Sequence, residues 1–320
     1  MKNQKGVALI TVLLVVALAT AVSAALMHRQ HLTIRSLSNQ LQARQAIYYA
    51  QGGERLAMAI LARDLRQGSV LPVDHPGEEW ANPNLHFPLD DGGALTLHIE
   101  DMAGRFNLNS LAQRGVNGEL ALLRMQRLLH RLDLPEVYAL RLKDWLDTDQ
   151  NPSTESSSED AQYLLAQPAY RTGSGEIADT SELRLLAGMT FSEYQRLEPF
   201  VSALPPETAL NVNTASRHVL GALGEGIPEA VLQTLINGRD RDGYPDLNVI
   251  PLHLNEYGAT TRGLAVSSQF FRVTTMVELG EHRQVLTSYV QRGHNGRVRL
   301  LARDLGQDAY SLQPIEDNKR

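Results

Sequence analysis

Acidic side chains are concentrated in one stretch of the sequence, at residues 133–182. This stretch holds 11 acidic and 3 basic residues, for a net charge of −8, although the whole 320-residue chain carries only −6. Oxygen-bearing side chains alternate through its middle as in the first half of an EF-hand loop: Asp147, Asp149, Asn151, Ser153 and Glu155. Hard oxygen ligands of this kind suit Ca²⁺ better than a transition metal.

The EF-hand pattern fails after this first half. Pro152 stands where that loop needs Gly, and the twelfth position is Ser158 instead of Glu. The spacing alone therefore leaves two interpretations open, a solvated acidic loop and an irregular site for a divalent cation.

Other chemistry has little support in the sequence. The chain contains no Cys, which excludes disulfides, thiolate zinc sites and Cys catalysis. No nucleophile elbow, zinc-protease, phosphate-loop or dinucleotide motif is present. The sequence therefore predicts a protein that is not an enzyme, and its acidic balance argues against a dedicated nucleic-acid binder.

The N-terminus carries a second chemical signal, a potential processing site. Met1–Gly6 is short and basic, and Val7–Met27 is an uncharged run of 21 residues. As a helix this run spans roughly 31 Å, which matches the hydrocarbon thickness of a bilayer. It could be a secretory signal peptide, a plain signal anchor or a prepilin-like leader. The last reading also explains Gly6, because the leader would be cut after it and the apolar helix retained.

The elements after the apolar run favour retention of the helix. Residues 28–67 continue with helical spacing, and apolar residues recur at steps of three, four, seven or eight: Ile34, Leu37, Leu41, Tyr48, Leu56 and Ile60. The pattern predicts one helix of roughly 60 residues, about 90 Å long. Gly52 and Gly53 are its weak point, and we interpret them as a kink or a close approach to a sheet.

Strand patterns bracket the middle of the chain. Residues 94–101 alternate apolar and polar side chains, and three further strands are expected at 270–279, 284–292 and 298–304. The last three have short turns between them, which is typical of an antiparallel meander. We therefore expect an antiparallel sheet interrupted by an insertion.

The insertion, residues 106–263, has the sequence pattern of helices and contains a short internal repeat, the Asn-containing echo. Residues 106–110 and 210–214 both read apolar-Asn-apolar-Asn-Ser/Thr, and each precedes a helical stretch. Asn, Ser and Thr are favourable helix N-caps, so the two copies predict two helical subdomains.

The second copy also permits a different function. Residues 216–239 resemble a helix-hairpin-helix, a unit that can bind DNA through hairpin amides. The only nearby cations are Arg217, Arg239 and Arg241, and Glu225 lies in the hairpin itself. The alternative is thus an inner-membrane-anchored periplasmic DNA-binding or DNA-uptake protein.

Together the basic leader ending in Gly6, the retained apolar helix and the amphipathic continuation resemble type IV pilins and pseudopilins. In that family the fifth residue of the mature chain is usually Glu, and here it is Thr11. This departure, the Asn-x-Asn-Ser/Thr repeats and the Asp144-Trp145-x-Asp147-x-Asp149 block are similar to the minor pseudopilin K of type II secretion systems.

The resemblance implies site residues and a cofactor. It implies structural Ca²⁺ bound by Asp147, Asp149, Glu159 and Asp160, with Asp144, Asn151 and Glu155 as weaker candidates. It also implies cleavage between Gly6 and Val7 by prepilin peptidase and N-methylation of Val7. Thr11 can hydrogen-bond to its own backbone, but it cannot neutralise the N-terminal amine of a neighbouring subunit as Glu does.

The expected fold class is α+β: a type IV pilin-like fold, in which a long N-terminal helix packs on a small antiparallel sheet, with a large α-helical insertion domain. The expected divisions are residues 1–6 (leader), 7–27 (transmembrane helix), 28–105 (first part of the pilin-like domain), 106–263 (insertion), 264–305 (C-terminal strands) and 306–320 (tail).

The resemblance implies that the protein caps and initiates the pseudopilus. Its partners would be minor pseudopilins I and J and, through them, H and the major pseudopilin G, with no nucleic acid. It would cross the inner membrane once and place its C-terminal domain in the periplasm.

Overall fold

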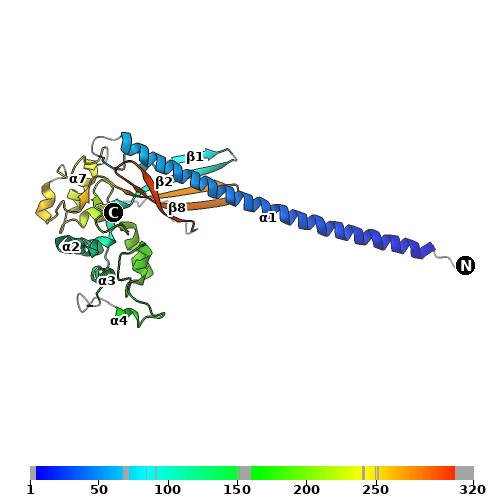
Figure 1. Cartoon of the computed structure of the whole chain (residues 1–320), viewed down its shortest axis with the longest axis horizontal. Helices are drawn as coiled ribbons and strands as arrows, with labels where there is room; N and C mark the ends of the chain where they lie inside the picture. The colour runs from blue at the N-terminus through cyan, green and yellow to red at the C-terminus, as the bar shows by residue number, and fades with distance from the viewer. Residues whose placement is uncertain are drawn as a thin grey trace.

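The structure is a computed structural model that describes residues 5–67, 72–83, 85–90, 92–149, 151, 160–239, 242–248, 250 and 252–306. A long helix runs from the N-terminus to a five-stranded sheet, and a second, mostly helical body lies at the far end of that helix (Figure 1). This arrangement confirms the expected α+β, pilin-like fold class.

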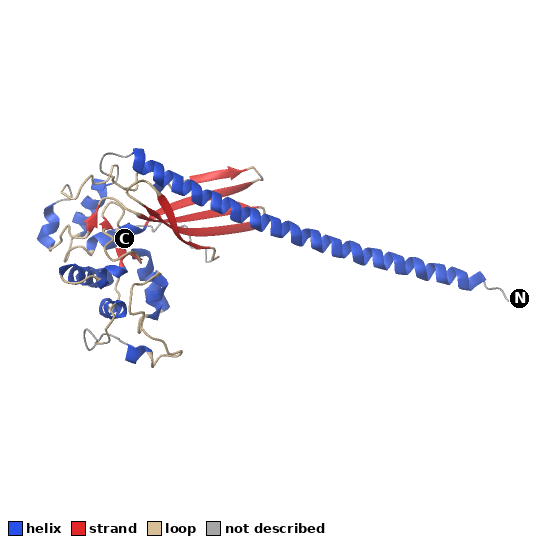
Figure 2. Ribbon diagram, viewed as in Figure 1, coloured by secondary structure: helices blue, strands red, loops and turns tan. Residues whose placement is uncertain are grey.

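Helix α1, Lys5–Gln67, is continuous over 63 residues and about 95 Å long. Its first half projects away from the rest of the molecule (Figure 2), and every side chain described from Ala8 to Leu41 is exposed. From there its C-terminal half packs against the sheet. The predicted continuity of the helix is therefore confirmed.

The face of α1 that packs on the sheet consists of small side chains. Ala46, Ala50 and Ala57 are each at most 1% exposed. At Gly53, a Cβ atom would lie 2.5 Å from Thr275 Cγ2, whereas at Gly52 it would meet nothing within 4 Å. The predicted close approach to a sheet is thus correct for Gly53, and the helix has no break there.

The apolar positions that indicated the helical period mostly face outward. Ile34, Leu37, Leu41 and Tyr48 are 55–72% exposed, and only Ile60 of the six is buried. The alanine and glycine face of α1 packs on the sheet, because small side chains let the backbones of the helix and the sheet approach closely. The larger apolar side chains are left as an uncovered stripe along α1.

The sheet has the strand order β1-β2-β7-β8-β9 and is antiparallel throughout. Its strands are β1 Leu85–Leu89, β2 Gly93–Asp101, β7 Phe270–Leu279, β8 His282–Arg292 and β9 Val298–Asp304. The four expected strands are present, and the β7–β8 turn is tighter than expected because Leu279 pairs directly with His282. Gly280, with φ of 59°, supplies the backbone conformation that this two-residue turn needs.

Strand β1 is an addition to the four strands that the sequence predicted. It contains Pro88, a residue that lowers the strand signal. Because β1 is an edge strand that pairs only with β2, the missing amide of Pro88 is tolerated.

The insertion leaves and re-enters the sheet between two neighbouring strands. Asp101 at the end of β2 pairs with Phe271 at the start of β7, so both ends of the insertion lie side by side. The helices of the insertion are α2 Val116–Arg131, α3 Val137–Leu146, α4 Asp160–Tyr163, α5 Phe191–Leu197, α6 Arg217–Gly221 and α7 Glu229–Arg239. Helices α6 and α7 lie within residues 216–239, the segment that the sequence likened to a helix-hairpin-helix.

Both halves of the insertion share one hydrophobic core, which runs from Phe106 to Ala259. The pilin-like part has its own core between α1 and the sheet. Two short parallel pairs also occur in the insertion: β3 Phe106–Asn107 with β4 Val201–Ser202, and β5 Leu210–Asn211 with β6 Leu264–Ala265. Each pair involves one copy of the Asn-containing echo.

Candidate functional site

The exposed half of α1 is the first functional element. It is long and apolar enough to cross a membrane, and none of its most apolar window is buried within the protein. The Thr11 hydroxyl donates to the Ala8 carbonyl at 2.9 Å, so this polar group is satisfied within the helix as expected. The predicted cleavage bond between Gly6 and Val7 lies in the first turn of α1, which begins at Lys5.

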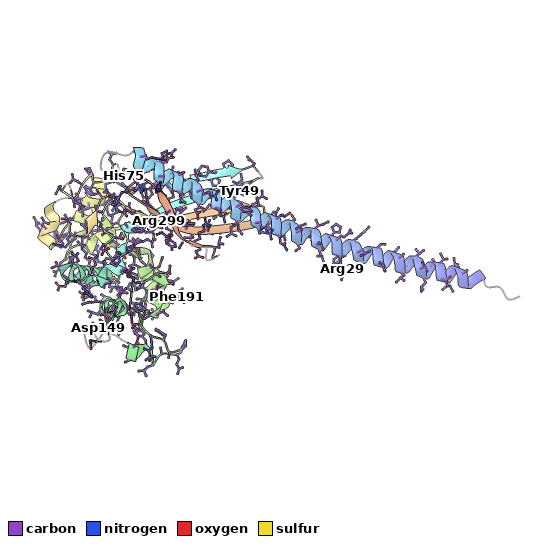
Figure 3. The ribbon with its side chains drawn as sticks, in the orientation of Figure 1. Arg29, Tyr49, His75, Asp149, Phe191 and Arg299 are labelled. Carbon is purple, nitrogen blue, oxygen red and sulfur yellow. The ribbon has the colours of Figure 1, made fainter. Side chains whose placement is uncertain are left out.

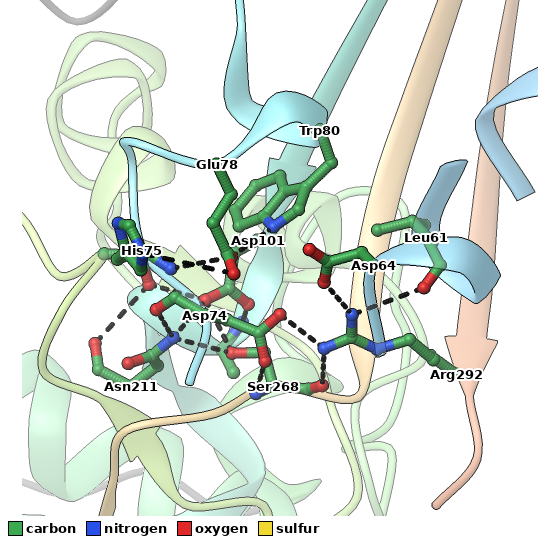
Figure 4. Close-up of polar contacts among 12 residues, drawn as sticks. Leu61, Asp64, Asp74, His75, Glu78, Trp80, Asp101, Asn211, Ser268 and Arg292 are labelled. Carbon is green, nitrogen blue, oxygen red and sulfur yellow. Dashed lines mark hydrogen bonds and ion pairs between the residues drawn. The ribbon is translucent and has the colours of Figure 1, made fainter. Parts of the chain in front are cut away.

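The second element joins α1, the sheet and the insertion at a buried polar cluster (Figure 4). We call Asp64, Asp74, Glu78, Asp101, Asn211, Ser268 and Arg292 the junction cluster. These residues come from α1, the segment that follows it, β2, the second Asn motif, the segment between β6 and β7, and β8.

Arg292 is the cation at the centre of the junction cluster. Its Nη1 donates to Asp64 Oδ2 at 2.8 Å and its Nη2 donates to Asp74 Oδ1. The guanidinium carbon also lies 4.9 Å from the centroid of the Phe271 ring. The Arg292 and Asp74 side chains are only 2% and 1% exposed, so this pair is buried, and Asp64 ties the C-terminal end of α1 to it.

Asp101 holds the two ends of the insertion together. Its Oδ2 accepts hydrogen bonds from Ser268 Oγ at 2.6 Å, Thr214 Oγ1 at 2.5 Å and Asn211 Nδ2 at 3.0 Å. Its Oδ1 accepts from the amide of Ala103 at 2.8 Å. The last residue of β2 therefore binds, at one point, the segment that leads into the insertion, the second Asn motif within it and the segment that leads out of it.

The junction cluster has more acid than base. Carboxylate oxygens of Asp64, Asp74 and Glu78 all lie within 4.8 Å of one another. Burial and the nearby Asp64 raise the pKa of Glu78 to about 7, and burial raises the pKa of Asp74 to about 6 although Arg292 opposes this. Burial also raises the pKa of Asp101. Near neutral pH the cluster therefore retains protons that exposed carboxylates would lose.

Two further carboxylates, Glu54 and Glu100, form three ion pairs between neighbouring elements. Glu54 of α1, 2% exposed, accepts from Arg303 of β9 at 2.6 and 2.7 Å and from Ser288 of β8 at 2.6 Å. Glu100 of β2 binds both Arg105 and Arg272, and these arginines hold its pKa at about 2 although burial opposes them.

Each copy of the Asn-containing repeat makes hydrogen bonds to distant parts of the chain, in addition to preceding a helix. In the first copy, the Asn109 side chain donates to the carbonyls of Ile177 and Leu204 and accepts from the amide of Ile177. In the second copy, Asn213 donates to the carbonyls of Tyr244 and Val266 and accepts from the amide of Tyr244.

The first Asn of each copy differs in its partners. Asn107 contacts the backbone of Leu204 and Pro205 within its own half, whereas Asn211 joins the junction cluster. Sequence reasoning treated these residues only as caps, so it missed the junction cluster. The repeated motif was the available signal, but nothing in the sequence pairs it with Asp101 or Asp74.

The predicted metal-ligating residues lie at the opposite end of the insertion from α1. Asp144 is buried on α3, while Asp147, Asp149 and Asn151 follow the end of that helix. Asp149 Oδ1 accepts from the amide of Asn151 at 2.8 Å. Glu155 and Glu159 lie outside the described residues.

Two observations bear on whether this loop suits a cation. Asp147 Oδ1 is buried and has no hydrogen-bond partner among the residues that the structure describes, and burial together with Asp149 and Asp144 raises the pKa of Asp147. Asp160, by contrast, accepts from Thr172 and pairs with Arg171 at 3.1 Å. The orphaned oxygen fits a cation beside Asp147, while Asp160 is engaged in protein contacts.

The helix-hairpin-helix region uses its cations internally. Arg217 pairs with Glu229, and Arg239 is buried and donates to the carbonyls of Val212 and Ala215. The hairpin amide of Glu225 donates to the Tyr257 carbonyl at 2.8 Å. Arg241 lies outside the described residues.

A long helix with an exposed apolar half, packed by its other half on an antiparallel sheet, defines the class of type IV pilin-like proteins. The comparisons with known proteins identify the family within it. The chain matches the family described as type II secretion system protein K at residues 104–206 and at residues 210–261. These two segments correspond to the two copies of the Asn motif.

Relatives align with nearly the whole chain. It is 50% identical to the type II secretion system protein K of Pseudomonas aeruginosa, over 97% of this chain and 96% of the relative. It is 33% identical to that of Klebsiella pneumoniae, over 91% and 93%. The chain belongs to the type II secretion system protein K family.

A solved structure is similar along most of the fold. The chain matches one from the crystal structure of the GspK–GspI–GspJ complex of enterotoxigenic Escherichia coli with a TM-score of 0.72 and 27% sequence identity. The match covers 84% of this chain and 98% of the solved one.

Proposed function

We propose that this protein is the tip subunit of the type II secretion pseudopilus, where it initiates assembly and caps the growing end. The observation that carries the proposal is the position of the insertion. It lies at the end of α1 opposite the apolar half, where a further subunit would otherwise stack (Figure 1).

Because α1 both crosses the membrane and carries the insertion, anchoring of its apolar half would fix where the insertion lies in the periplasm. The apolar half of α1 crosses the inner membrane once, and the sheet and insertion lie in the periplasm. Before assembly, prepilin peptidase removes the leader after Gly6, and Val7 becomes the methylated N-terminus. The junction cluster then fixes the insertion rigidly to the end of α1, because each part of it is hydrogen-bonded or ion-paired to another element.

The uncovered stripe on α1 supports direct contact with other pseudopilins. Ile34, Leu37, Leu41 and Tyr48 lie on one helical face and have no protein cover. Exposed apolar rows of this kind mark protein–protein contacts. We expect minor pseudopilins I and J to cover it, as the composition of the related complex suggests, with H and the major pseudopilin G following below.

Structural calcium is part of the same proposal. The cation would be held by Asp147 and Asp149, with Glu159 and Asp160 completing the set and Asp144, Asn151 and Glu155 as weaker candidates. The support is the orphaned Oδ1 of Asp147 and the mutual repulsion of the carboxylates around it. Bound Ca²⁺ would neutralise this repulsion and hold the loop in one shape.

Co-purification tests the assembly function. The full chain is co-expressed with minor pseudopilins I and J and purified from membranes with Ca²⁺ present; we expect a stable complex of all three. Leu37→Glu should abolish the complex because it places a charge in the α1 contact. Leu165→Glu, at a site 84% exposed on the insertion, is the matched control and should leave the complex intact. Failure of the unmodified chain to bind either partner would refute the proposal.

A further inference from the structure

A cavity of about 90 Å³ opens between the two halves of the insertion. The first half contributes residues such as Asn107 and Ser110, and the second contributes residues such as Leu210 and Val219. The cavity lies apart from both the acidic loop and the junction cluster, so neither of the features described above occupies it.

The charges around this cavity are unbalanced. Arg105, Arg124 and Arg262 line it, and none of the described residues that line it is acidic. Arg105 is neutralised from outside the cavity by Glu100 and Glu198. Among the described parts of the chain, no carboxylate pairs with Arg124 or Arg262, whose cationic groups therefore remain uncompensated.

Arg124 is the buried member of this pair. It is 7% exposed, its Nη2 donates to the Thr260 carbonyl at 2.9 Å, and its buried Nε finds no acceptor in the described part of the chain. Burial, assisted by the nearby Arg127, lowers its pKa to about 10, so it still carries its charge at neutral pH. A buried charge without a counter-ion is costly, and an anion in the cavity would remove that cost.

Arg262 lies in an exposed position and donates to Asn117 Oδ1 at 3.2 Å. It is thus placed to attract an anion from solvent toward the buried Arg124. The two cations come from segments far apart in the sequence, α2 and the chain after Tyr257, which the cavity brings together.

The size and walls of the cavity restrict the anion. A single water molecule needs about 10–15 Å³ of such space, so the cavity holds a group of only a few heavy atoms. Much of its wall is apolar, with Phe106, Leu120, Leu128 and Leu204 among the lining residues. A guanidinium presents a planar fork that matches a carboxylate. A monoanion on a short apolar stem fits these features better than a phosphate, whose larger charge would need more cations.

We propose that this cavity is a binding site for a carboxylate on a short apolar stem, with Arg124 as the buried anchor and Arg262 at the entrance. Two sources share this chemistry, a free short-chain carboxylic acid and the C-terminal residue of a polypeptide. The site does not depend on the position of the protein in the pseudopilus.

Calorimetric titration of the full chain in lipid nanodiscs tests the site. The probes are sodium butyrate, its neutral counterpart butyramide, and the peptide Gly-Ser-Ala-Val with either a free or an amidated C-terminus. We expect saturable binding of at least one carboxylate probe and at least tenfold weaker binding of its amide. Equal binding of acid and amide, or no binding of any acid, would overturn the proposal.

Variants separate ligand binding from a purely structural role of Arg124. Arg124→Met should weaken carboxylate binding at least tenfold while leaving the melting temperature equal or higher, because it removes an uncompensated buried charge. Arg124→Lys keeps the charge but loses the fork and should bind with intermediate affinity. The matched control is Arg127→Met, on the same helix but outside the cavity lining, and it should change affinity less than twofold.

The outcomes also identify the source of the carboxylate. Tighter binding of the free-acid peptide than of butyrate would support a polypeptide C-terminus, and the reverse would support a small acid. If Arg124→Met lowers the melting temperature and leaves carboxylate affinity unchanged, Arg124 serves only to hold the Thr260 carbonyl and the proposal is wrong.

Discussion

Arg292 is the residue at which the long helix, the sheet and the insertion meet. One guanidinium serves both Asp64 and Asp74, and Asp101 depends on neutral donors alone. Breaking a buried pair of this kind costs about 3–5 kcal/mol because a charge is left without compensation. The orientation of the insertion on α1 thus depends on a few buried side chains. Figure 3 shows this region by the label of His75, which lies near the C-terminal end of α1.

Glu78 makes the stability of this junction depend on pH. Its pKa is about 7 in the folded protein against an ordinary value of 4.5, so the folded state binds a proton that the unfolded chain has lost over that interval. Its contribution to stability is therefore present below pH 4.5 and is lost as the pH rises through 7.

Glu78→Gln tests this dependence. The Gln carbonyl can still accept from the His75 amide and the Trp80 indole, as Glu78 does at 3.1 and 2.6 Å. We expect the free energy of unfolding to rise on the order of 1 kcal/mol at pH 8, after allowance for partial solvent screening, and to change little at pH 5. Denaturant unfolding at the two pH values measures this. The exposed neighbour provides the control, since Glu79→Gln should show no such gain; a gain at pH 5 equal to that at pH 8 would contradict the assignment.

Asp147 and Asp149 carry the calcium prediction. Adding Ca²⁺ should raise the melting temperature of the full chain, and excess chelator should reverse the rise, because the cation binds the folded loop alone. Asp147→Asn or Asp149→Asn should weaken Ca²⁺ affinity at least tenfold in a calorimetric titration. Glu176→Gln removes one exposed acid elsewhere in the same stretch and should leave the affinity unchanged. A melting temperature indifferent to Ca²⁺ would exclude a structural ion.

At the scale of elements, α1 is governed by the size of the side chains on its buried face. Gly53 approaches Thr275 and Leu95 so closely that a methyl group has no room, whereas Gly52, one residue earlier, faces open space. These adjacent glycines therefore allow the same substitution to be compared in two environments.

Gly53→Ala and Gly52→Ala should have opposite effects on stability. Overpacking at Gly53 should lower the free energy of unfolding by about 1–3 kcal/mol. At Gly52 the better helix propensity of Ala should raise it by about 1 kcal/mol. Denaturant unfolding of the two full-length variants in detergent measures both. Equal effects of the two substitutions would show that the contact of Gly53 with the sheet does not limit packing.

The same elements show what sequence patterns can and cannot predict. Periodicity located α1 and four of the five sheet strands, because their buried and exposed positions follow the helix or strand period. It missed β1, whose Pro88 is acceptable only at an edge, and it could not assign the outward stripe of α1. Edge position and the choice of buried face depend on partners that are distant in the sequence.

The candidate sites likewise divide into those that the sequence could reveal and those that only the fold brings together. The acidic loop was visible because its candidate ligands are close together in the sequence, from Asp144 to Asp160. The junction cluster joins residues as far apart as Asp64 and Arg292, and only the folded chain brings them together. No sequence motif marks Arg124, because the cavity that it lines forms only when the second half of the insertion packs against α2.

At the scale of the whole molecule, the insertion replaces the turn between two neighbouring strands. Its ends leave β2 and enter β7 side by side, so the pilin-like part remains intact beneath it. The junction cluster and the paired strands β2 and β7 connect α1 to the insertion, so a force along α1 would pass through them. This arrangement suits a subunit that is carried at the end of a filament.

Cysteine cross-linking tests that position directly, since the chain contains no Cys and any introduced thiol is unique. Ile34→Cys, on the stripe of α1, should cross-link to a cysteine placed on α1 of a neighbouring pseudopilin. Leu165→Cys, on the insertion at 84% exposure, should cross-link to no pseudopilin, because a tip subunit has none above it. Both thiols are accessible, so labelling with a maleimide shows that any difference arises from proximity. Efficient cross-linking of Leu165→Cys to the major pseudopilin would place a subunit on the insertion and would contradict the cap.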